Sequence, residues 1–313
     1  MATPLRKMLL AAGALVLAVG AVYVVHTEGI LYASAGQRSA SVAAATPANA
    51  TTVHSITVPV SDQASSRDFY VKQLGFTVVK DVPGAAERWI ELVPPWGVDS
   101  ATIVLSATTD MKPGSYRGLF WEVNDCASAV AAIRARGVAA QDCVDSPPGP
   151  LADFADPDGN VWTLSECDGS GTSAVPTPSA SSPPVSPSVS AFEALDYADG
   201  TLANVGIPVS DQDRAMAFYV DALGFTVLKD RPNPAPFPGR YIELAAPGGG
   251  AHITLSVWWE SMPAGSLRGL RLGTGDITGT IAALRGKGVA VDGGTGSFTD
   301  PDGNAWSVTK TTS

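Results

Sequence analysis

Residues 59–78 of this chain read PVSDQASSRDFYVKQLGFTV, and residues 208–227 read PVSDQDRAMAFYVDALGFTV. Three further matches follow in the same order: Ile-Glu-Leu at 90–92 and 242–244, Arg-Gly-Leu at 117–119 and 268–270, and Asp-Pro-Asp-Gly-Asn at 156–160 and 300–304. The repeated unit has the size of a domain and is too long for a solenoid repeat. We therefore interpret the 313 residues as a tandem duplication that forms two domains.

Each repeat predicts an α+β fold made of two similar halves. In repeat one, Asp62 caps a helix that closes at Gly75, and Asp125 caps a second helix that closes at Gly137. Alternating apolar and polar residues predict the strands. In repeat one these are 54–60, 76–80, 88–93, 101–107, 119–123, 138–144, 151–154 and 160–165. Each repeat is then a pair of βαβββ modules; spacing alone leaves open two unrelated α+β halves.

Composition divides the chain into globular and extended parts. An apolar run at 8–25 follows Arg6 and Lys7, which predicts a cleaved signal peptide or an uncleaved membrane anchor. Either alternative makes the rest of the chain secreted or part of the cell envelope, and only the anchor makes the membrane a partner. The expected boundaries are a signal or anchor at 1–35, a disordered spacer at 36–51, domain one at 52–167, a Ser/Pro-rich linker at 168–200, and domain two at 201–313.

The charge of the chain excludes one class of partner. The formal net charge is −10, and no run of Lys or Arg is present. Nucleic acid is therefore a poor partner, because its binding depends on clustered positive charge.

Three cysteines lie in the second half of repeat one, at Cys126, Cys143 and Cys167. Export would permit a disulfide, and the odd count leaves one thiol over. The ends of the first and last strands of a module should meet at one edge of its sheet. We therefore favour Cys126–Cys167 as the pair.

Strand alternation also predicts which side chains face a cleft. The apolar positions should lie under the helices, so the opposite positions should face the other module. In domain one the candidate ligand-binding residues of this face are Trp89, Glu91, Phe120 and Glu122. They favour a slot for a flat or cationic ligand.

Domain two offers a different set of cleft-facing residues. A turn at 247–250 should make Glu243 and His252 neighbours across a hairpin, and Tyr241 and Arg271 share their face. Glu243 and His252 are candidate catalytic residues for acid–base chemistry, and Tyr241 and Arg271 are candidates for ligand binding. The alternative is a salt-bridged groove without activity.

These motifs resemble the vicinal oxygen chelate superfamily, which is the glyoxalase/bleomycin resistance/extradiol dioxygenase fold. The features that carry the resemblance are PVSD followed by FY and LGF, the Arg134–Val138 and Lys287–Val289 segments, and DPDGN before the last strand. The resemblance implies two tandem domains, each a pair of βαβββ modules that form a cleft between curved mixed sheets. It leaves function open, because the fold supports isomerases, lyases, dioxygenases and antibiotic-binding proteins.

Metal-dependent members of the family hold the ion at four positions of the cleft. Domain one places Ser55, Glu91, Gly118 and Thr163 there, and domain two places Asn204, Glu243, Gly269 and Ser307. One carboxylate per domain is a poor donor set for a catalytic metal. His54 is one residue out of register, which turns a strand side chain to the other face. We therefore expect no cofactor, with a divalent metal as the alternative.

Three functions remain compatible with these residues. The favoured hypothesis is an exported or membrane-tethered protein that binds a small organic molecule in its clefts without a family-type metal. The second is a lyase, isomerase or dioxygenase with a site around Glu243 and His252. The third is a structural or interaction module without activity.

Overall fold

The computed structural model describes residues 50–95, 101–146, 149–166, 201–233, 237–257 and 259–311, without the side chains of 201–203. The predicted export segment, spacer and linker lie outside the described residues, and so does Cys167. Within the described ranges, no helix is long and apolar enough to cross a membrane.

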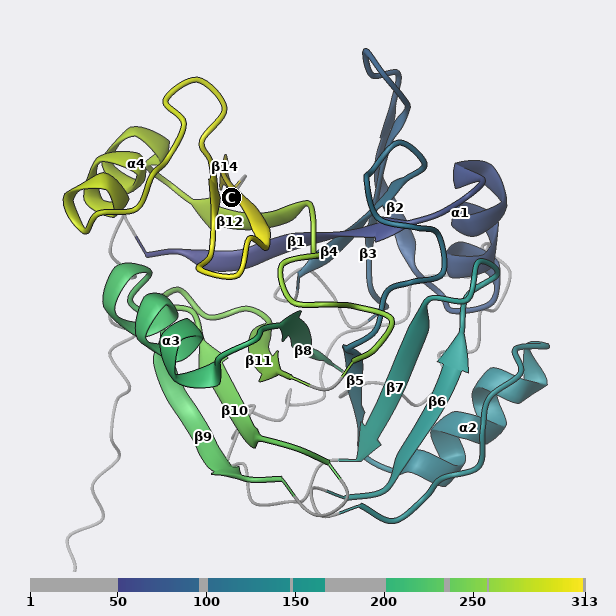
Figure 1. Ribbon diagram of the computed structural model, residues 1–313. Helices are drawn as coiled ribbons and strands as arrows, with labels where there is room; N and C mark the ends of the chain where they lie inside the picture. Colours follow the sequence, from purple (N-terminus) through teal and green to yellow (C-terminus); the bar gives the residue numbers. More distant parts are fainter. Residues whose placement is uncertain are drawn as a thin grey trace, which may run out of the picture. The chain divides into compact units, whose positions relative to one another are not determined.

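The strands form two mixed sheets of seven strands each (Figure 1). We call the first one the terminal sheet, because it joins the first and the last module of the chain. Its strands, in spatial order, are β13 (Ser297–Thr299), β14 (Ala305–Lys310), β12 (Leu270–Thr274), β1 (Thr52–Pro59), β4 (Thr102–Ser106), β3 (Trp89–Val93) and β2 (Thr77–Val82).

The second sheet joins the two middle modules, and we call it the central sheet. Its strands, in spatial order, are β6 (Leu151–Ala155), β7 (Val161–Glu166), β5 (Leu119–Val123), β8 (Thr201–Pro208), β11 (His252–Ser256), β10 (Arg240–Ala245) and β9 (Thr226–Pro232). The α+β class and the tandem arrangement of βαβββ-like modules are thereby confirmed.

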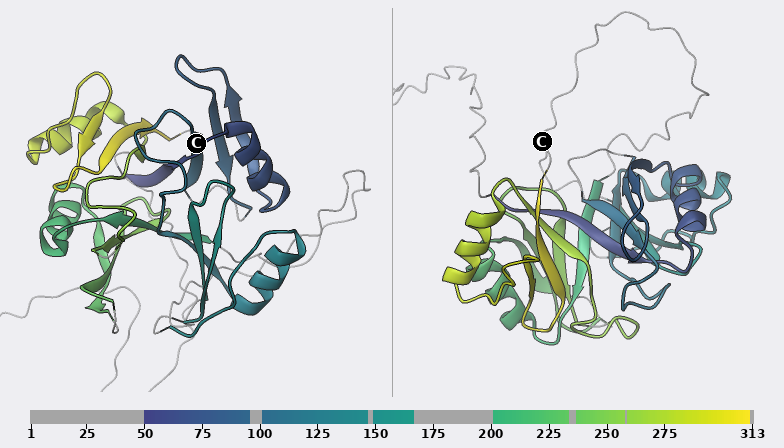
Figure 2. Two further views of the ribbon diagram at one scale, coloured as in Figure 1. Left: turned by 45° about the vertical axis from the view of Figure 1, so that its right-hand side comes forward. Right: turned by 90° about the horizontal axis from the view of Figure 1, so that it is seen from above.

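Each sheet is shared between the two repeats. The antiparallel pair of β1 and β12 sets Val53 opposite Leu272, and the antiparallel pair of β5 and β8 sets Leu119 opposite Val205. The expectation that the two modules of one repeat form a cleft together is therefore wrong. Figure 2 shows the helices of repeat one on one side and those of repeat two on the other, while both sheets run across.

The aromatic packing within each repeat explains this exchange. Tyr70 lies 5.3 Å from Phe76 and 6.0 Å from Trp162, measured between ring centroids. The Tyr70 hydroxyl donates to Asp156 (2.9 Å) and accepts from Trp162 Nε1 (3.2 Å). These contacts join the helix side of the first module to the sheet of the second. The apolar faces of the two modules of one repeat pack against each other, so the open faces of these modules point in opposite directions. The free strand edge of each module is therefore paired with a module of the other repeat.

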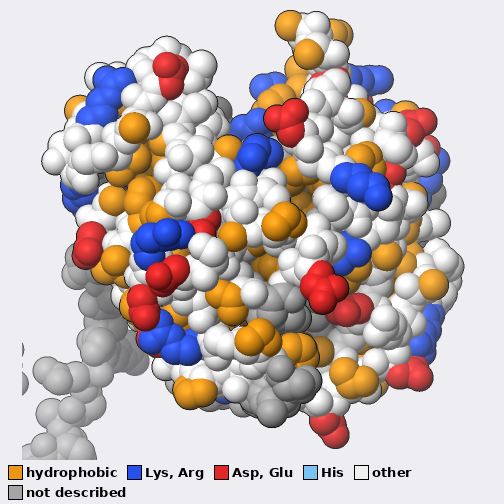
Figure 3. Space-filling view, viewed as in Figure 1, with side chains coloured by type: hydrophobic (Ala, Val, Ile, Leu, Met, Phe, Trp, Pro, Cys, Tyr) orange, Lys and Arg blue, Asp and Glu red, His pale blue; other side chains and the backbone are white. Residues whose placement is uncertain are grey.

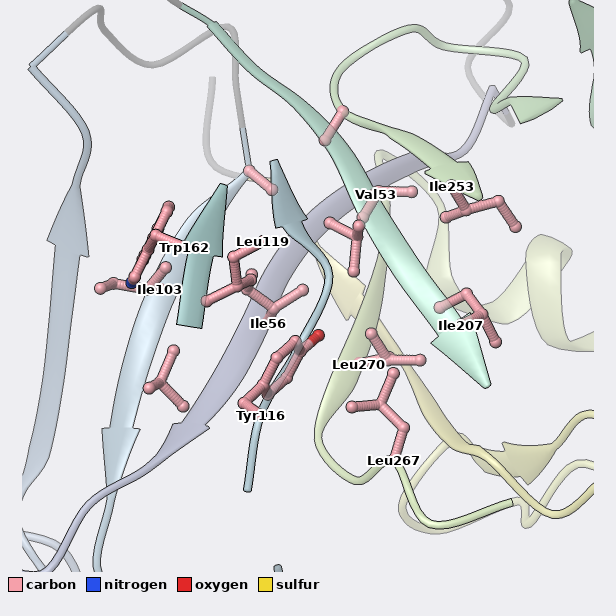
Figure 4. Close-up of a cluster of buried hydrophobic side chains, with 14 of the residues drawn as sticks. Val53, Ile56, Ile103, Tyr116, Leu119, Trp162, Ile207, Ile253, Leu267 and Leu270 are labelled. Carbon is pink, nitrogen blue, oxygen red and sulfur yellow. The ribbon is translucent and has the colours of Figure 1, made fainter. Parts of the chain in front are cut away.

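The packing between the sheets forms one continuous hydrophobic core. Figure 4 shows Ile56 and Ile103 beside Leu119 in one part of this core, and Ile207 beside Leu270 in another. All five side chains are fully buried. Burial of aliphatic side chains of this size stabilises a fold by about 1.5–3 kcal/mol each. The core fixes which face of each sheet remains open.

The helices begin where the sequence predicts. The side chains of Asp62, Asp125, Asp211 and Asp276 accept hydrogen bonds from backbone N–H groups of the first helical turn, as N-caps do. The helices are α1 (Gln63–Lys72), α2 (Cys126–Ala135), α3 (Gln212–Ala217), which continues into the π-helical turn η1 (Phe218–Ala222), and α4 (Ile277–Gly286).

Two expectations for the second module are wrong. The predicted strand at 138–144 is reduced to isolated bridges at Ala140 and Val144, because Arg134 takes the Ala140 carbonyl. The disulfide joins Cys126 to Cys143 instead of Cys167. Backbone bonds with Asp153 and Leu151 hold residues 141–144 along β6, which returns Cys143 to the start of α2.

Arg117 and Arg268, which the two repeats share, have a structural role. Arg117 donates to the carbonyl oxygens of Gly114, Tyr116 and Gly159, at 2.7–3.0 Å. Arg268 makes the equivalent bonds in repeat two. The DPDGN motifs are turns, since the Asp156 carboxylate accepts from the backbone N–H groups of residues 158–160.

Candidate ligand-binding sites

The open faces of the two sheets carry equivalent sets of polar and aromatic side chains. Figure 3 shows the surface hollowed at the top, between the β13–β14 edge and the β2–β3 edge of the terminal sheet. We call the set on that face the terminal site: His54, Ser55, Trp89, Glu91, Thr102 and Arg271. The equivalent set on the central sheet is the central site: Phe120, Asn204, Tyr241, Glu243, His252 and Thr254.

The carboxylate of the terminal site orients an aromatic ring. Trp89 and Glu91 are two residues apart on β3, so both side chains lie on one face. Glu91 accepts from Trp89 Nε1 (3.1 Å) with one oxygen and from Thr102 Oγ1 (2.7 Å) with the other. Both oxygens are thereby engaged, and the half-buried indole ring is held by its polar edge.

Arg271 reaches the same ring from the other repeat. Its guanidinium carbon lies 4.3 Å from the Trp89 ring centroid, within the range of a cation–π interaction. In the β1–β12 register Arg271 is opposite Ser55, whose hydroxyl it contacts at 3.5 Å. Burial lowers the pKa of the Arg271 guanidinium, and the Glu91 carboxylate opposes this shift. Arg271 remains charged at neutral pH.

His54 also belongs to the terminal site, which the expected strand register excluded. The β1–β12 pairing shifts register between Val53 and Ser55, and a bulge of this kind redirects the side chain at the shift. Burial lowers the pKa of His54, Glu91 raises it and Arg271 lowers it further. The charges of Glu91 and Arg271 therefore both act on the His54 side chain.

The lowered pKa of His54 predicts a pH-dependent stability. The unfolded chain takes up this proton first as the pH falls below 6.5, the ordinary value. The His54 contribution is thus complete above that pH and is lost as the pH falls through the folded pKa. We expect His54→Gln to lose less thermal stability than the wild type between about pH 7.5 and about pH 5. Identical losses of melting temperature in both proteins would contradict this assignment.

The central site is built around a buried carboxylate at the equivalent position. Glu243 is 3% exposed, so almost all of its charge must be met by protein groups. It contacts His252 Nδ1 at 2.7 Å and Lys229 Nζ at 3.1 Å, and it accepts from the Tyr241 hydroxyl at 3.2 Å. Burial alone would raise the pKa of Glu243, but His252 and Lys229 outweigh it and lower the pKa. The predicted Glu243–His252 contact is present.

Further hydrogen bonds hold the Tyr241 ring in place. Asn204 Nδ2 donates to the Tyr241 hydroxyl (3.3 Å), and Asn204 Oδ1 accepts from Thr254 Oγ1 (2.7 Å). The guanidinium of Arg231 lies 5.2 Å from the Tyr241 ring centroid. Burial and the Glu243 charge raise the pKa of Tyr241, so its hydroxyl is neutral. The central site thus repeats the arrangement in which a carboxylate orients a ring.

The shared sheets redistribute the residues predicted to act together. Arg271 lies with Trp89 and Glu91 in the terminal sheet, so the expected group of Glu243, His252 and Arg271 does not form. Trp89 and Phe120 are likewise in different sheets. Glu122 lies in the central sheet, where its charge acts on Tyr241.

The positions of the family metal do not fit an ion in either site. The terminal site combines Ser55 and Glu91 with Gly269 and Ser307, and the central site combines Asn204 and Glu243 with Gly118 and Thr163. At Gly118 the Trp259 ring occupies the space, since an added Cβ would lie 2.4 Å from it. Within the described ranges, no group of three or more His, Cys, Asp or Glu residues could hold an ion. Both carboxylates are already engaged by protein donors.

Sequence reasoning did not select Lys229, Thr102, Thr254 or Trp259 as site residues. The sequence did contain a signal for Lys229, because Lys-Asp follows the LGF motif in both repeats, at 80–81 and 229–230. In the structure Lys80 lies 5.4 Å from the Trp89 ring centroid. Trp259 has no counterpart in repeat one, so the duplication gave no signal for it.

The geometry agrees with comparisons to known proteins. The profile of the Glyoxalase/Bleomycin resistance protein/Dioxygenase superfamily matches residues 52–164 and 201–308. The chain belongs to this superfamily. No curated protein matches the chain.

Solved structures of this superfamily resemble one repeat or both. TnmS3, an antibiotic binding protein from Streptomyces sp. CB03234, is 39% identical over 37% of this chain and 94% of its own, with a TM-score of 0.35. Glyoxalase I from Zea mays is 16% identical over 83% of this chain and 92% of its own, with a TM-score of 0.59. A putative dioxygenase from Bacillus subtilis is 13% identical over 84% of this chain and 86% of its own, with a TM-score of 0.55. At the latter two identities the likeness concerns the fold.

Proposed function

We propose that this superfamily member binds small organic molecules with a flat ring in its terminal and central sites, without a family-type metal. The observation that carries the proposal is the Trp89 ring of the terminal site. Glu91 holds its polar edge, and Arg271 of the other repeat lies over it. An ordered aromatic ring that carries a guanidinium over it and stays partly exposed on an open sheet face can contact a flat ligand at little entropic cost.

The use of the two carboxylates supports binding over metal chemistry. Glu91 and Glu243 occupy the same position in the two repeats, and each accepts a hydrogen bond from the aromatic residue two positions earlier. A carboxylate that orients a ring is unavailable as a strong metal donor unless that bond breaks. In both sites the carboxylate at the family's metal-ligand position thus fixes an aromatic ring.

Replacing Trp89 tests the proposal. We expect Trp89→Ala to weaken binding of a flat aromatic probe, such as naphthalene-1-carboxylate, by about 2 kcal/mol or about 30-fold, which is typical for a central aromatic contact. Isothermal titration calorimetry on the folded chain measures this. The matched control is Val79→Ala, which changes a 52% exposed side chain on the neighbouring edge strand β2. Equal affinities of the wild type and Trp89→Ala would contradict the proposal.

The first ligands to screen follow from the relatives. The relative from Streptomyces is an antibiotic binding protein, which suggests antibiotics as a test class, and the Trp89 ring favours those with a flat ring. Saturable binding by the wild type, lost in Trp89→Ala, would identify a ligand of the terminal site.

A second candidate function is catalysis in the central site. The observation in its favour is the 2.7 Å contact between His252 Nδ1 and Glu243, which leaves Nε2 of a one-third exposed ring to exchange a proton with a ligand. Loss of turnover in both Glu243→Gln and His252→Ala would support an enzyme. Unchanged turnover in both variants would exclude this function.

We also propose that the protein is exported. The basic and apolar residues at 6–25 favour export, and the Cys126–Cys143 disulfide suits an oxidising compartment. Cell fractionation tests this proposal: recovery in the cytoplasm with both cysteines reduced would contradict it.

A further inference from the structure

The internal repeat provides a matched comparison between the two sites. Arg271 of β12 is opposite Ser55 of β1, and Phe120 of β5 is opposite Asn204 of β8. Since Ser55 and Asn204 are themselves equivalent, Arg271 and Phe120 occupy the same place. The terminal site therefore has a guanidinium where the central site has an uncharged ring.

The hydrogen-bonding capacity of Arg271 is largely unused. A guanidinium has five N–H donors. Apart from the 3.5 Å contact with Ser55, the described part of the chain offers Arg271 no hydrogen bond and no ion pair. Arg117 differs, because three carbonyl oxygens meet its guanidinium. A half-buried cation with spare donors binds an anionic acceptor more strongly than a neutral one.

Orientation of the aromatic ring does not require an Arg at this position. In the central site the Tyr241 ring is held by Glu243 and Asn204, while Phe120 occupies the equivalent place. In the terminal site Glu91 and Lys80 already contact Trp89. A purely structural role therefore leaves the charge of Arg271 unexplained.

The charges around the two sites differ accordingly. In the terminal site Lys80 and Arg271 lie over the Trp89 ring, Glu91 is the carboxylate bonded to that ring, and burial favours neutral His54. The neighbouring carboxylate, Glu87, is engaged by the Ser106 hydroxyl and the Ala107 N–H. In the central site, Lys229 and Arg231 are balanced by Glu243 and Glu122. The Trp89 ring of the terminal site thus contacts two cations and one carboxylate, whereas the cations at the Tyr241 ring of the central site are matched by two carboxylates.

We infer that the terminal site selects organic anions, in which a carboxylate or a similar acidic group attached to a flat ring pairs with the guanidinium of Arg271. The central site accepts flat molecules without this preference. This inference rests on the proposed binding function and adds the ligand class. Charge-assisted, bidentate hydrogen bonds between guanidinium and carboxylate supply the selectivity.

Two isosteric probes on the full chain test the inference. Naphthalene-1-carboxylate and naphthalene-1-carboxamide share ring and shape and differ in charge. We expect the wild type to bind the acid about tenfold or more tightly than the amide at one of its two sites. Arg271→Phe introduces the residue that the central site already carries, and it should bring the ratio close to one. Arg271→Gln is a second variant that removes the charge but keeps a polar side chain.

The reciprocal variant and the outcomes complete the test. Phe120→Arg should create a second site that prefers the acid, while Val79→Ala should leave both affinities unchanged. Equal binding of acid and amide by the wild type, with both weakened in Trp89→Ala, would overturn the anion preference and leave the proposed function standing. An acid preference that persists in Arg271→Phe and Arg271→Gln would also overturn it. Absence of binding by either probe would count against both proposals.

Discussion

Repeat one expressed alone, as residues 50–166, is expected to form a dimer. In the full chain β1 pairs with β12 and β5 pairs with β8, so separation of the repeats leaves β1 and β5 as open sheet edges. Open edges recruit further strands. Because repeat one contains both edges, two copies can pair β1 with β5 twice in a closed, two-fold symmetric arrangement.

Sedimentation equilibrium measures this state directly. Repeat two, residues 201–311, should dimerise for the same reason, and co-expression of both repeats should give a heterodimer that restores the terminal and central sites. A repeat one that is monomeric at micromolar concentration and unfolds cooperatively would contradict the shared sheets.

Trp162→Ala is expected to destabilise the protein by about 3–5 kcal/mol, the usual cost of removing a large buried aromatic side chain. Trp162 is fully buried, and its ring lies 5.8 Å from Phe76 and 6.3 Å from Phe154. Its Nε1 donates to the Tyr70 hydroxyl, so the variant also removes a hydrogen bond from a buried network.

Urea unfolding followed by far-UV circular dichroism measures the loss. The matched variant is Trp306→Ala, whose ring makes the same contacts with Tyr219 and Phe298 in repeat two. The control is Val144→Ala, at a 61% exposed position. A loss below about 1 kcal/mol in both Trp variants would mean that the cores relax around the cavity, contrary to the close packing inferred here.

The sequence predicts the modules well, because their signals are local. Asp62 and Asp125 cap helices at the predicted places, and the strand alternation correctly assigns Ile56 and Trp162 to the core. The predicted contact between Glu243 and His252 is present, because a short hairpin places the two residues next to each other. In each case the interacting residues lie close together in the chain.

The errors concern partners that are distant in sequence. Alternation predicts that Arg271 faces an open site, but it cannot tell whether that site holds Glu243 or Trp89. The choice depends on the packing of whole modules. The bulge that brings His54 into the terminal site exists only in the pairing of β1 with β12. Cys143 pairs with Cys126 because backbone bonds of an irregular segment return it to α2, and no periodic pattern encodes such a segment.

The central claim is that each site is shared by the two repeats, and a double-mutant cycle between Trp89 and Arg271 tests it most directly. The affinity for naphthalene-1-carboxylate is measured for the wild type, Trp89→Ala, Arg271→Phe and the double variant. Residues that contact each other and share a ligand should show a coupling energy of about 1 kcal/mol. Additive losses, within about 0.3 kcal/mol, would place the two residues in separate sites and contradict the account.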